Sequence, residues 1–115
     1  MKSSYAGKYL SAAVGAFGCL AIGQADAATL GEPTAGKAYA QMHCASCHSI
    51  VPNGNTSPVA EALPFQMIAD TGGMTRTALF VFFRTPHPTM PNLIVRGDDV
   101  DNIIAYILSL KTAKQ

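Results

Sequence analysis

Two of the three cysteines in this chain of 115 residues stand in the pentapeptide Cys44-Ala45-Ser46-Cys47-His48. A C-x-x-C pair serves three kinds of chemistry, namely dithiol redox exchange, zinc binding and covalent attachment of haem. Each constrains the fold differently. Dithiol exchange of the thioredoxin type needs an α/β context, a structural zinc needs four ligands, and a haem provides a large apolar core. The histidine that follows the second cysteine favours haem.

The N-terminus has the pattern of a secretory signal peptide. A basic start with Lys2 and Lys8 precedes an apolar stretch over 10–23, and the small-residue site Ala25-Asp26-Ala27 follows. The stretch is shorter than the roughly 18 apolar residues that a membrane span requires. We therefore expect residues 1–27 to be removed and residues 28–115 to form one domain without a membrane span.

Removal of this segment changes the charge and the cysteine count. Without Lys2 and Lys8, six of the eight Lys and Arg residues remain, and without Asp26 six of the seven acids remain. The mature chain is then close to neutral, so neither nucleic acid nor an anionic membrane surface is an expected partner. Cys19 is interpreted as part of the apolar stretch, with lipidation as the minor alternative. A domain this short buries only about 60% of its unfolded surface, so a cofactor would stabilise it.

The mature chain has helical patterns and no convincing alternation of the strand type. The clearest helix begins at Asp98, where three aspartates fill the first turn, and an apolar stripe follows at helical spacing. The first helix is expected to present Cys44 and Cys47 on one face, one turn apart. We predict an all-α fold, with helices over 32–42, 65–69 and 75–84 and from 98 onward, and with loops over 49–58 and 85–96.

Two of the three C-x-x-C chemistries fit the rest of the chain poorly. No strand precedes the motif, as a thioredoxin-like site would require. A zinc site would have only His43 and His87 to add to Cys44, Cys47 and His48, and there is no second C-x-x-C pair. Covalent haem attachment uses two thiols for two vinyl groups and one imidazole for the iron, and it occurs outside the cytoplasm, in agreement with the export signal.

Met90 is the candidate for the iron ligand on the face opposite His48. It lies between prolines, just before the last helix, where packing alone gives little reason for a methionine. Methionine is more often an adaptable core residue, and that interpretation suits Met42 and Met67. Met74, which follows two glycines, stays ambiguous.

On these residues the chain resembles the small class I cytochromes c over roughly 34–111. The resemblance is carried by Gly36, the pentapeptide, Met90-Pro91 and a last helix that contains Tyr106. It implies short helices and loops around one haem c bound covalently through Cys44 and Cys47, with His48 and Met90 on the iron. It also implies that the first and last helices cross, with Gly36 and Tyr106 at the crossing.

The resemblance leaves several residues without an assigned role. Members of the family orient the ligating imidazole through a backbone carbonyl, and the nearest matching segment here is Ala62-Leu63-Pro64-Phe65, shifted by one residue, so the acceptor stays open. His43 and His87 are expected at the surface. Three arginines are candidates for pairing with the haem propionates, although a solvated arginine is the commoner outcome. They are Arg76, Arg84 and Arg96.

A histidine and a methionine on the iron fill both axial positions and raise the reduction potential. We therefore expect a monomeric electron carrier rather than an enzyme, in a bacterial periplasm, with a dehydrogenase, an oxidase or a respiratory complex as redox partner. The alternatives are a haem enzyme subunit or a ligand-binding haem protein with a labile sixth ligand, and a subunit dedicated to one partner.

The run Leu93-Ile94-Val95 suggests docking by an apolar rim, with electron-exchange rates that depend little on ionic strength.

Overall fold

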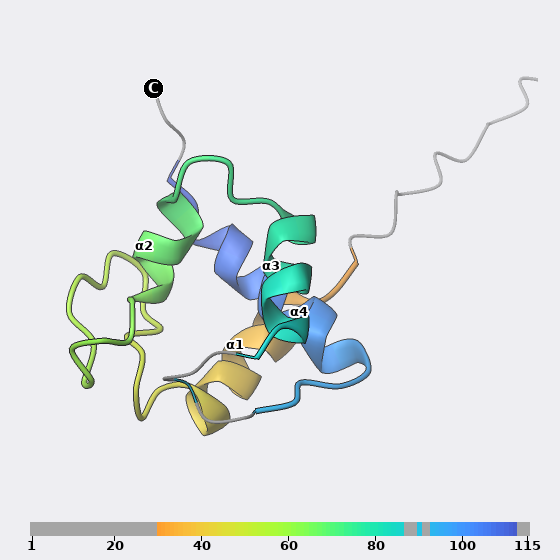
Figure 1. Ribbon diagram of the computed structural model, residues 1–115, viewed down its shortest axis with the longest axis horizontal. Coiled ribbons are helices and arrows are strands. Elements are labelled where there is room, and N and C mark those ends of the chain that lie inside the picture. The colour runs from red at the N-terminus through yellow and green to blue at the C-terminus, as the bar shows by residue number, and fades with distance from the viewer. Residues whose placement is uncertain (1–29, 87–89, 91–92, 113–115) are drawn as a thin grey trace, which may run out of the picture.

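The structure, a computed structural model, describes residues 30–86, 90 and 93–112, and these residues form four helices and no strand (Figure 1). The all-α prediction is confirmed, and each predicted helix is present within one or two residues of its expected start. The expected signal peptide and its cleavage site lie outside the described residues. No helix in the described ranges combines the length and apolarity needed to cross a bilayer. The helices are α1 (Pro33–His43), α2 (Phe65–Asp70), α3 (Arg76–Arg84) and α4 (Asp98–Ser109).

Local sequence signals explain where the helices begin. Pro33 occupies the first turn of α1, where its missing N–H is not needed. The Thr75 hydroxyl caps α3 by accepting a hydrogen bond of 3.2 Å from the Ala78 N–H, as expected for a threonine cap. Helix α4 follows Gly97, whose φ of 56° lies in the left-handed region that favours glycine. These local signals account for the residues at which α1, α3 and α4 begin.

Helices α1 and α4 pack against each other, so the first and last helices are in contact as predicted (Figure 1). Gly36 and Ala40 are the buried residues of α1. A Cβ on Gly36 would overlap the carbonyl oxygen of Asn102 and come within 2.8 Å of Tyr106 Cβ. The N–H of Glu32 also donates to the Asn102 side chain at 2.7 Å. The absence of a side chain at Gly36 therefore sets how closely the two helices approach.

Gly36→Ala is expected to destabilise the protein by about 1–3 kcal/mol, the usual cost of overpacking a core. Alanine has the higher helix propensity, so a loss of stability would come from the helix contact and not from α1 itself. The free energy of unfolding, measured with denaturant, checks this. Gly72→Ala is the matched control, because a Cβ there meets nothing within 4 Å. Equal effects of the two substitutions would contradict the role given to Gly36.

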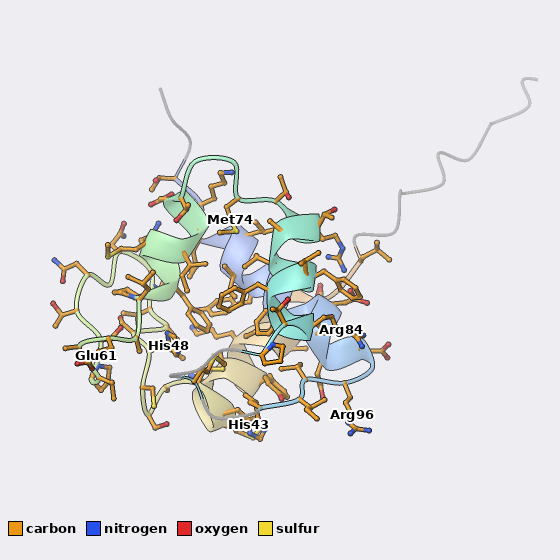
Figure 2. The ribbon with its side chains drawn as sticks, viewed as in Figure 1. His43, His48, Glu61, Met74, Arg84 and Arg96 are labelled. Carbon is orange, nitrogen blue, oxygen red and sulfur yellow. The ribbon has the colours of Figure 1, made fainter. Side chains whose placement is uncertain are left out.

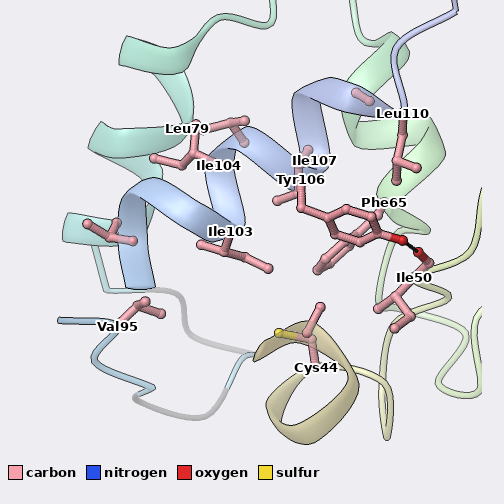
Figure 3. Close-up of a cluster of buried hydrophobic side chains, with 13 residues drawn as sticks. Cys44, Ile50, Phe65, Leu79, Val95, Ile103, Ile104, Tyr106, Ile107 and Leu110 are labelled. Carbon is pink, nitrogen blue, oxygen red and sulfur yellow. Dashed lines mark hydrogen bonds between the residues drawn. The ribbon is translucent and has the colours of Figure 1, made fainter. Parts of the chain in front are cut away.

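The core lies around α4, as the cluster of buried side chains in Figure 3 shows. Ile103, Ile104 and Ile107 are its largest fully buried side chains. Tyr106 is buried as well, and its hydroxyl donates a hydrogen bond of 2.5 Å to the carbonyl oxygen of Ile50. This bond ties α4 to the segment that follows the pentapeptide.

Gln66 is the buried polar side chain of the described core, and it links three segments. Its Nε2 donates to the carbonyl of Leu110 at 2.7 Å and to Asp70 Oδ2 at 2.8 Å. Its Oε1 accepts from the Asn53 N–H at 2.9 Å. A buried amide with all these partners avoids the cost of an unsatisfied polar group. Gln66 therefore holds α2 against the loop that contains Asn53 and against Leu110 at the end of α4.

Asp70 extends this network to Thr112 and gives the fold a pH dependence. The Thr112 hydroxyl donates to the carboxylate at 2.7 Å, and this bond, followed by those from Gln66 and the Thr112 N–H, lowers the pKa of Asp70. A lowered folded-state pKa means that the carboxylate stabilises the fold above about pH 4 and that this contribution is lost as the pH falls through the folded-state pKa.

Asp70→Asn should therefore be less stable than the wild type at pH 7, and the difference should shrink as the solution is made acid. Unfolding midpoints between pH 7 and pH 3, followed by circular dichroism, measure it. Thr112→Val should show the same trend with a smaller amplitude, because it removes one of the three donors. A difference between wild type and Asp70→Asn that stays constant with pH would rule this interpretation out.

Candidate functional site

A partly open cavity of about 410 Å³ lies beside α4, and its lining is mainly apolar. This volume falls within the range of about 300–1,000 Å³ that is usual for ligand and cofactor pockets. Segments from most of the described chain contribute to its walls, including all four residues predicted as cofactor ligands. Those four are Cys44, Cys47, His48 and Met90.

The pentapeptide forms a tight turn directly after α1. The N–H of Cys44 bonds to Ala40 O at 2.8 Å, and the N–H groups of Cys47 and His48 bond to Cys44 O at 3.1 and 2.9 Å. The cysteines therefore stand in the turn rather than within the helix, which ends at His43. The turn still brings both thiols and the imidazole to the wall of one cavity.

Both thiols are free, and they differ in exposure. Cys44 is buried at 8% exposure and belongs to the core cluster, whereas Cys47 is half-buried. Burial, and then the neighbouring Cys47, raise the pKa of the Cys44 thiol to about 11. At neutral pH in the folded chain Cys44 is therefore a protonated thiol, which is a weak nucleophile.

One ring nitrogen of His48 is held by the backbone. Its Nδ1 lies 2.7 Å from the carbonyl oxygen of Leu63, and because a carbonyl accepts, Nδ1–H is the donor. The neutral imidazole then has its lone pair on Nε2, the nitrogen free to bind a metal, and a bond of this kind usually fixes the orientation of a metal-binding histidine. The structure thus supplies the acceptor that the sequence left open, within the segment Ala62-Leu63-Pro64-Phe65.

The segment around Leu63 is itself fixed to the pentapeptide. The N–H of Val59 donates to Cys47 O at 3.2 Å, and the N–H of Phe65 donates to Ser49 O at 2.8 Å. The Phe65 ring lies 5.5 Å from the His48 ring, between their centroids. The loop over 59–63 is therefore held near the pentapeptide at both of its ends, and Figure 2 labels Glu61 and His48 on the same side of the molecule.

Two methionines line the cavity. Met90 is half-buried, and the prolines that flank it at 88 and 91 lie outside the described residues, as does His87. Met74 lines the cavity too, and its carbonyl accepts a hydrogen bond of 3.1 Å from Lys111 Nζ. The thioether of Met74, ambiguous in the sequence, is therefore a competitor to Met90 for any metal bound there.

The interpretation of Met42 and Met67 as core residues is wrong. They are 72% and 51% exposed, and neither lines the cavity. The reason is geometric, because α1 turns its small residues Gly36 and Ala40 toward α4 and leaves Met42 facing solvent. His43, whose ring is tilted by 38° against that of Tyr39 with centroids 4.4 Å apart, is exposed as expected.

The described arginines lie away from the cavity lining. Arg76 pairs with Asp101 and donates to the carbonyl of Leu30, so it braces α3 against α4 rather than standing solvated. The Arg84 guanidinium lies over the Phe80 ring, 4.9 Å from its centroid. Arg96 is exposed. Among these three residues we find no partner for a propionate in the described walls of the cavity.

Sequence reasoning missed five residues that line the cavity and are also exposed. Three are apolar, one is a threonine, and one is a carboxylate, which makes it the acidic residue of the described lining. Three of the five belong to an irregular loop without periodicity, so no sequence pattern indicated them. The five are Val59, Glu61, Leu63, Thr71 and Phe82.

The donor set of the cavity fits a covalently attached haem. Two thiols three residues apart, an imidazole with Nε2 as its lone-pair nitrogen, and a thioether meet one apolar cavity of cofactor size. The rival chemistries fit less well. A thioredoxin-like site needs a strand, and the described chain has none. Within the same residues no group of three or more His, Cys, Asp or Glu side chains is arranged to hold a metal ion such as zinc.

Comparison of the chain with models of known protein families, with curated proteins and with solved structures finds no match. The case for any function therefore depends on the residues and contacts described above.

Proposed function

We propose that this protein is an exported monohaem c-type cytochrome of the class I fold, which carries single electrons between redox proteins in the bacterial periplasm. The observation that carries the proposal is the meeting of Cys44, Cys47, His48 and Met90 at one apolar cavity. Bound there, a haem supplies iron that gains and loses one electron.

Each residue of the site has a distinct task in this proposal. Cys44 and Cys47 would hold a haem covalently, and His48 would bind its iron through Nε2 while the Leu63 carbonyl keeps the imidazole ring in orientation. Met90 would give the iron a second protein ligand. A haem iron with two protein ligands favours electron transfer over binding of oxygen or substrate.

The apolar wall has a role of its own. Side chains such as Phe65, Ile68 and Ile107 line the cavity and exclude water from the cofactor. A dry, weakly polar environment disfavours the more highly charged form of a redox centre, and it also limits the reorganisation that accompanies electron transfer. Core and cofactor site are continuous, because Cys44, Phe65 and Ile107 belong to both.

Absorption spectra of the protein purified from the periplasm of a host that attaches haem, in oxidised and reduced states, test the proposal. We expect the narrow bands of a low-spin c-type haem and an intact mass greater than that of residues 28–115 by one haem. A colourless protein of unmodified mass would refute it. A reduced spectrum that changes strongly with carbon monoxide would instead favour the ligand-binding alternative.

A further inference from the structure

Apolar side chains make up most of the exposed part of the cavity lining. Val59, Leu63 and Phe82 line the cavity and are 40%, 53% and 44% exposed. Val59 and Leu63 come from the loop over 59–63, whereas Phe82 comes from α3. Large apolar side chains that are exposed together at a cavity mouth are typical of a surface that another molecule covers.

Glu61 stands within this apolar rim. It lies between Val59 and Leu63, lines the cavity and is exposed. None of the Lys and Arg side chains that the structure describes lines the cavity. Once the thiols and the imidazole are used by the cofactor, Glu61 is the charged side chain left on the described rim, and its charge is negative.

The run Leu93-Ile94-Val95, which suggested an apolar rim from sequence, does not form it. Val95 is buried, and none of the three residues lines the cavity. The rim is instead built by the loop that orients His48, since Leu63 supplies both the carbonyl bonded to His48 and an exposed side chain. A partner that covers this rim would therefore contact the segment next to the iron ligand.

Resting on the proposed function, we infer that the redox partner docks on the rim formed by Val59, Glu61, Leu63 and Phe82 and presents an apolar contact with a Lys or Arg opposite Glu61. A cation is required because a carboxylate that loses its water at an interface without a counter-charge opposes binding. An apolar partner face is required because the rest of the rim offers few groups for hydrogen bonds. Because residues 28–115 are nearly neutral overall, the charge of Glu61 decides whether a cationic or an anionic partner is preferred.

Two small oxidants of opposite charge act as probes of this surface. Tris(1,10-phenanthroline)cobalt(III) is a cation with aromatic ligands, and hexacyanoferrate(III) is an anion. Each takes one electron from the reduced haem, which becomes ferric while the probe is reduced by one electron. Stopped-flow rates are measured for the holoprotein at low salt and again at about 1 M salt, where the screening length is roughly 3 Å.

Glu61→Gln should lower the rate with the cobalt cation about threefold at low salt and raise the rate with the anion by a similar factor. High salt should remove both changes. Glu32→Gln is the matched control, because it makes the same change in net charge at an exposed residue that does not line the cavity. Leu63→Ser keeps the carbonyl that binds His48 and should slow the reaction with the cobalt probe.

The haem spectrum of each protein distinguishes a failure of the proposed function from a failure of the proposed docking surface. A wild-type protein without bound haem refutes the proposed function and this surface together. A normal haem spectrum with the same rates in Glu61→Gln and Glu32→Gln refutes the surface alone. Faster reaction of Glu61→Gln with the cation would likewise overturn it.

Discussion

A double variant Cys44→Ala/Cys47→Ala is expected to lose covalent haem completely and to lose most of its helical structure with it. The overlap of core and cavity explains the size of the effect. Cys44, Phe65 and Ile107 belong to both, so without the cofactor this apolar surface would face water. Whole domains are stable by only roughly 5–15 kcal/mol, and a domain this small depends on such burial.

Absorbance of the haem band, intact mass and far-ultraviolet circular dichroism measure this loss. Ser46→Ala is the control, since it removes an exposed hydroxyl 3.8 Å from Cys47 Sγ and keeps both thiols. Each single cysteine variant retains one thioether and should hold haem less firmly. A double variant that is free of haem and keeps the helicity of the wild type would show that the fold does not depend on the cofactor.

Met90→Ala is expected to keep its covalent haem and to change the chemistry of the iron. Cys44, Cys47 and His48 are untouched by the substitution, so attachment should be normal. Loss of the thioether should lower the reduction potential, within the range of roughly 0.8 V that axial ligands span. The open position should bind carbon monoxide in the reduced state. Potentiometry and carbon monoxide difference spectra provide the measurement.

Met74→Ala is the informative comparison, because Met74 is the other methionine that lines the cavity. It should cost some stability through lost packing against the core and leave the iron spectrum unchanged. Met42→Ala should change neither property, since that side chain is exposed and distant from the cavity lining. If Met74→Ala or His87→Ala alters the spectrum and Met90→Ala does not, Met90 is the wrong ligand.

The helices could be predicted because their signals are local. A threonine cap, a proline in the first turn and three aspartates before an apolar stripe each act within a few residues. Local signals do not predict the contact between the first and last helices. That prediction came from the family resemblance carried by Gly36 and Tyr106. Met42 was misassigned because an apolar residue in a helix does not show which side faces the rest of the protein.

The missing parts of the site could not be predicted because they are not encoded by residue type. The acceptor for His48 is the backbone carbonyl of Leu63, a group that every residue carries. Glu61 and Val59 lie in an irregular loop, and their approach to the pentapeptide depends on backbone bonds to Cys47 and Ser49. Chain folding, rather than any motif, brings them to the cavity.

The burial of Cys44 also sets an order in which the site has to be assembled. In the folded chain the Cys44 thiol is 8% exposed and burial raises its pKa, so it reacts poorly once the core has closed around it. The haem-free chain is expected to lack most of its helices, which leaves both thiols accessible. An enzyme that modifies these cysteines should therefore act on the exported chain before the first and last helices meet.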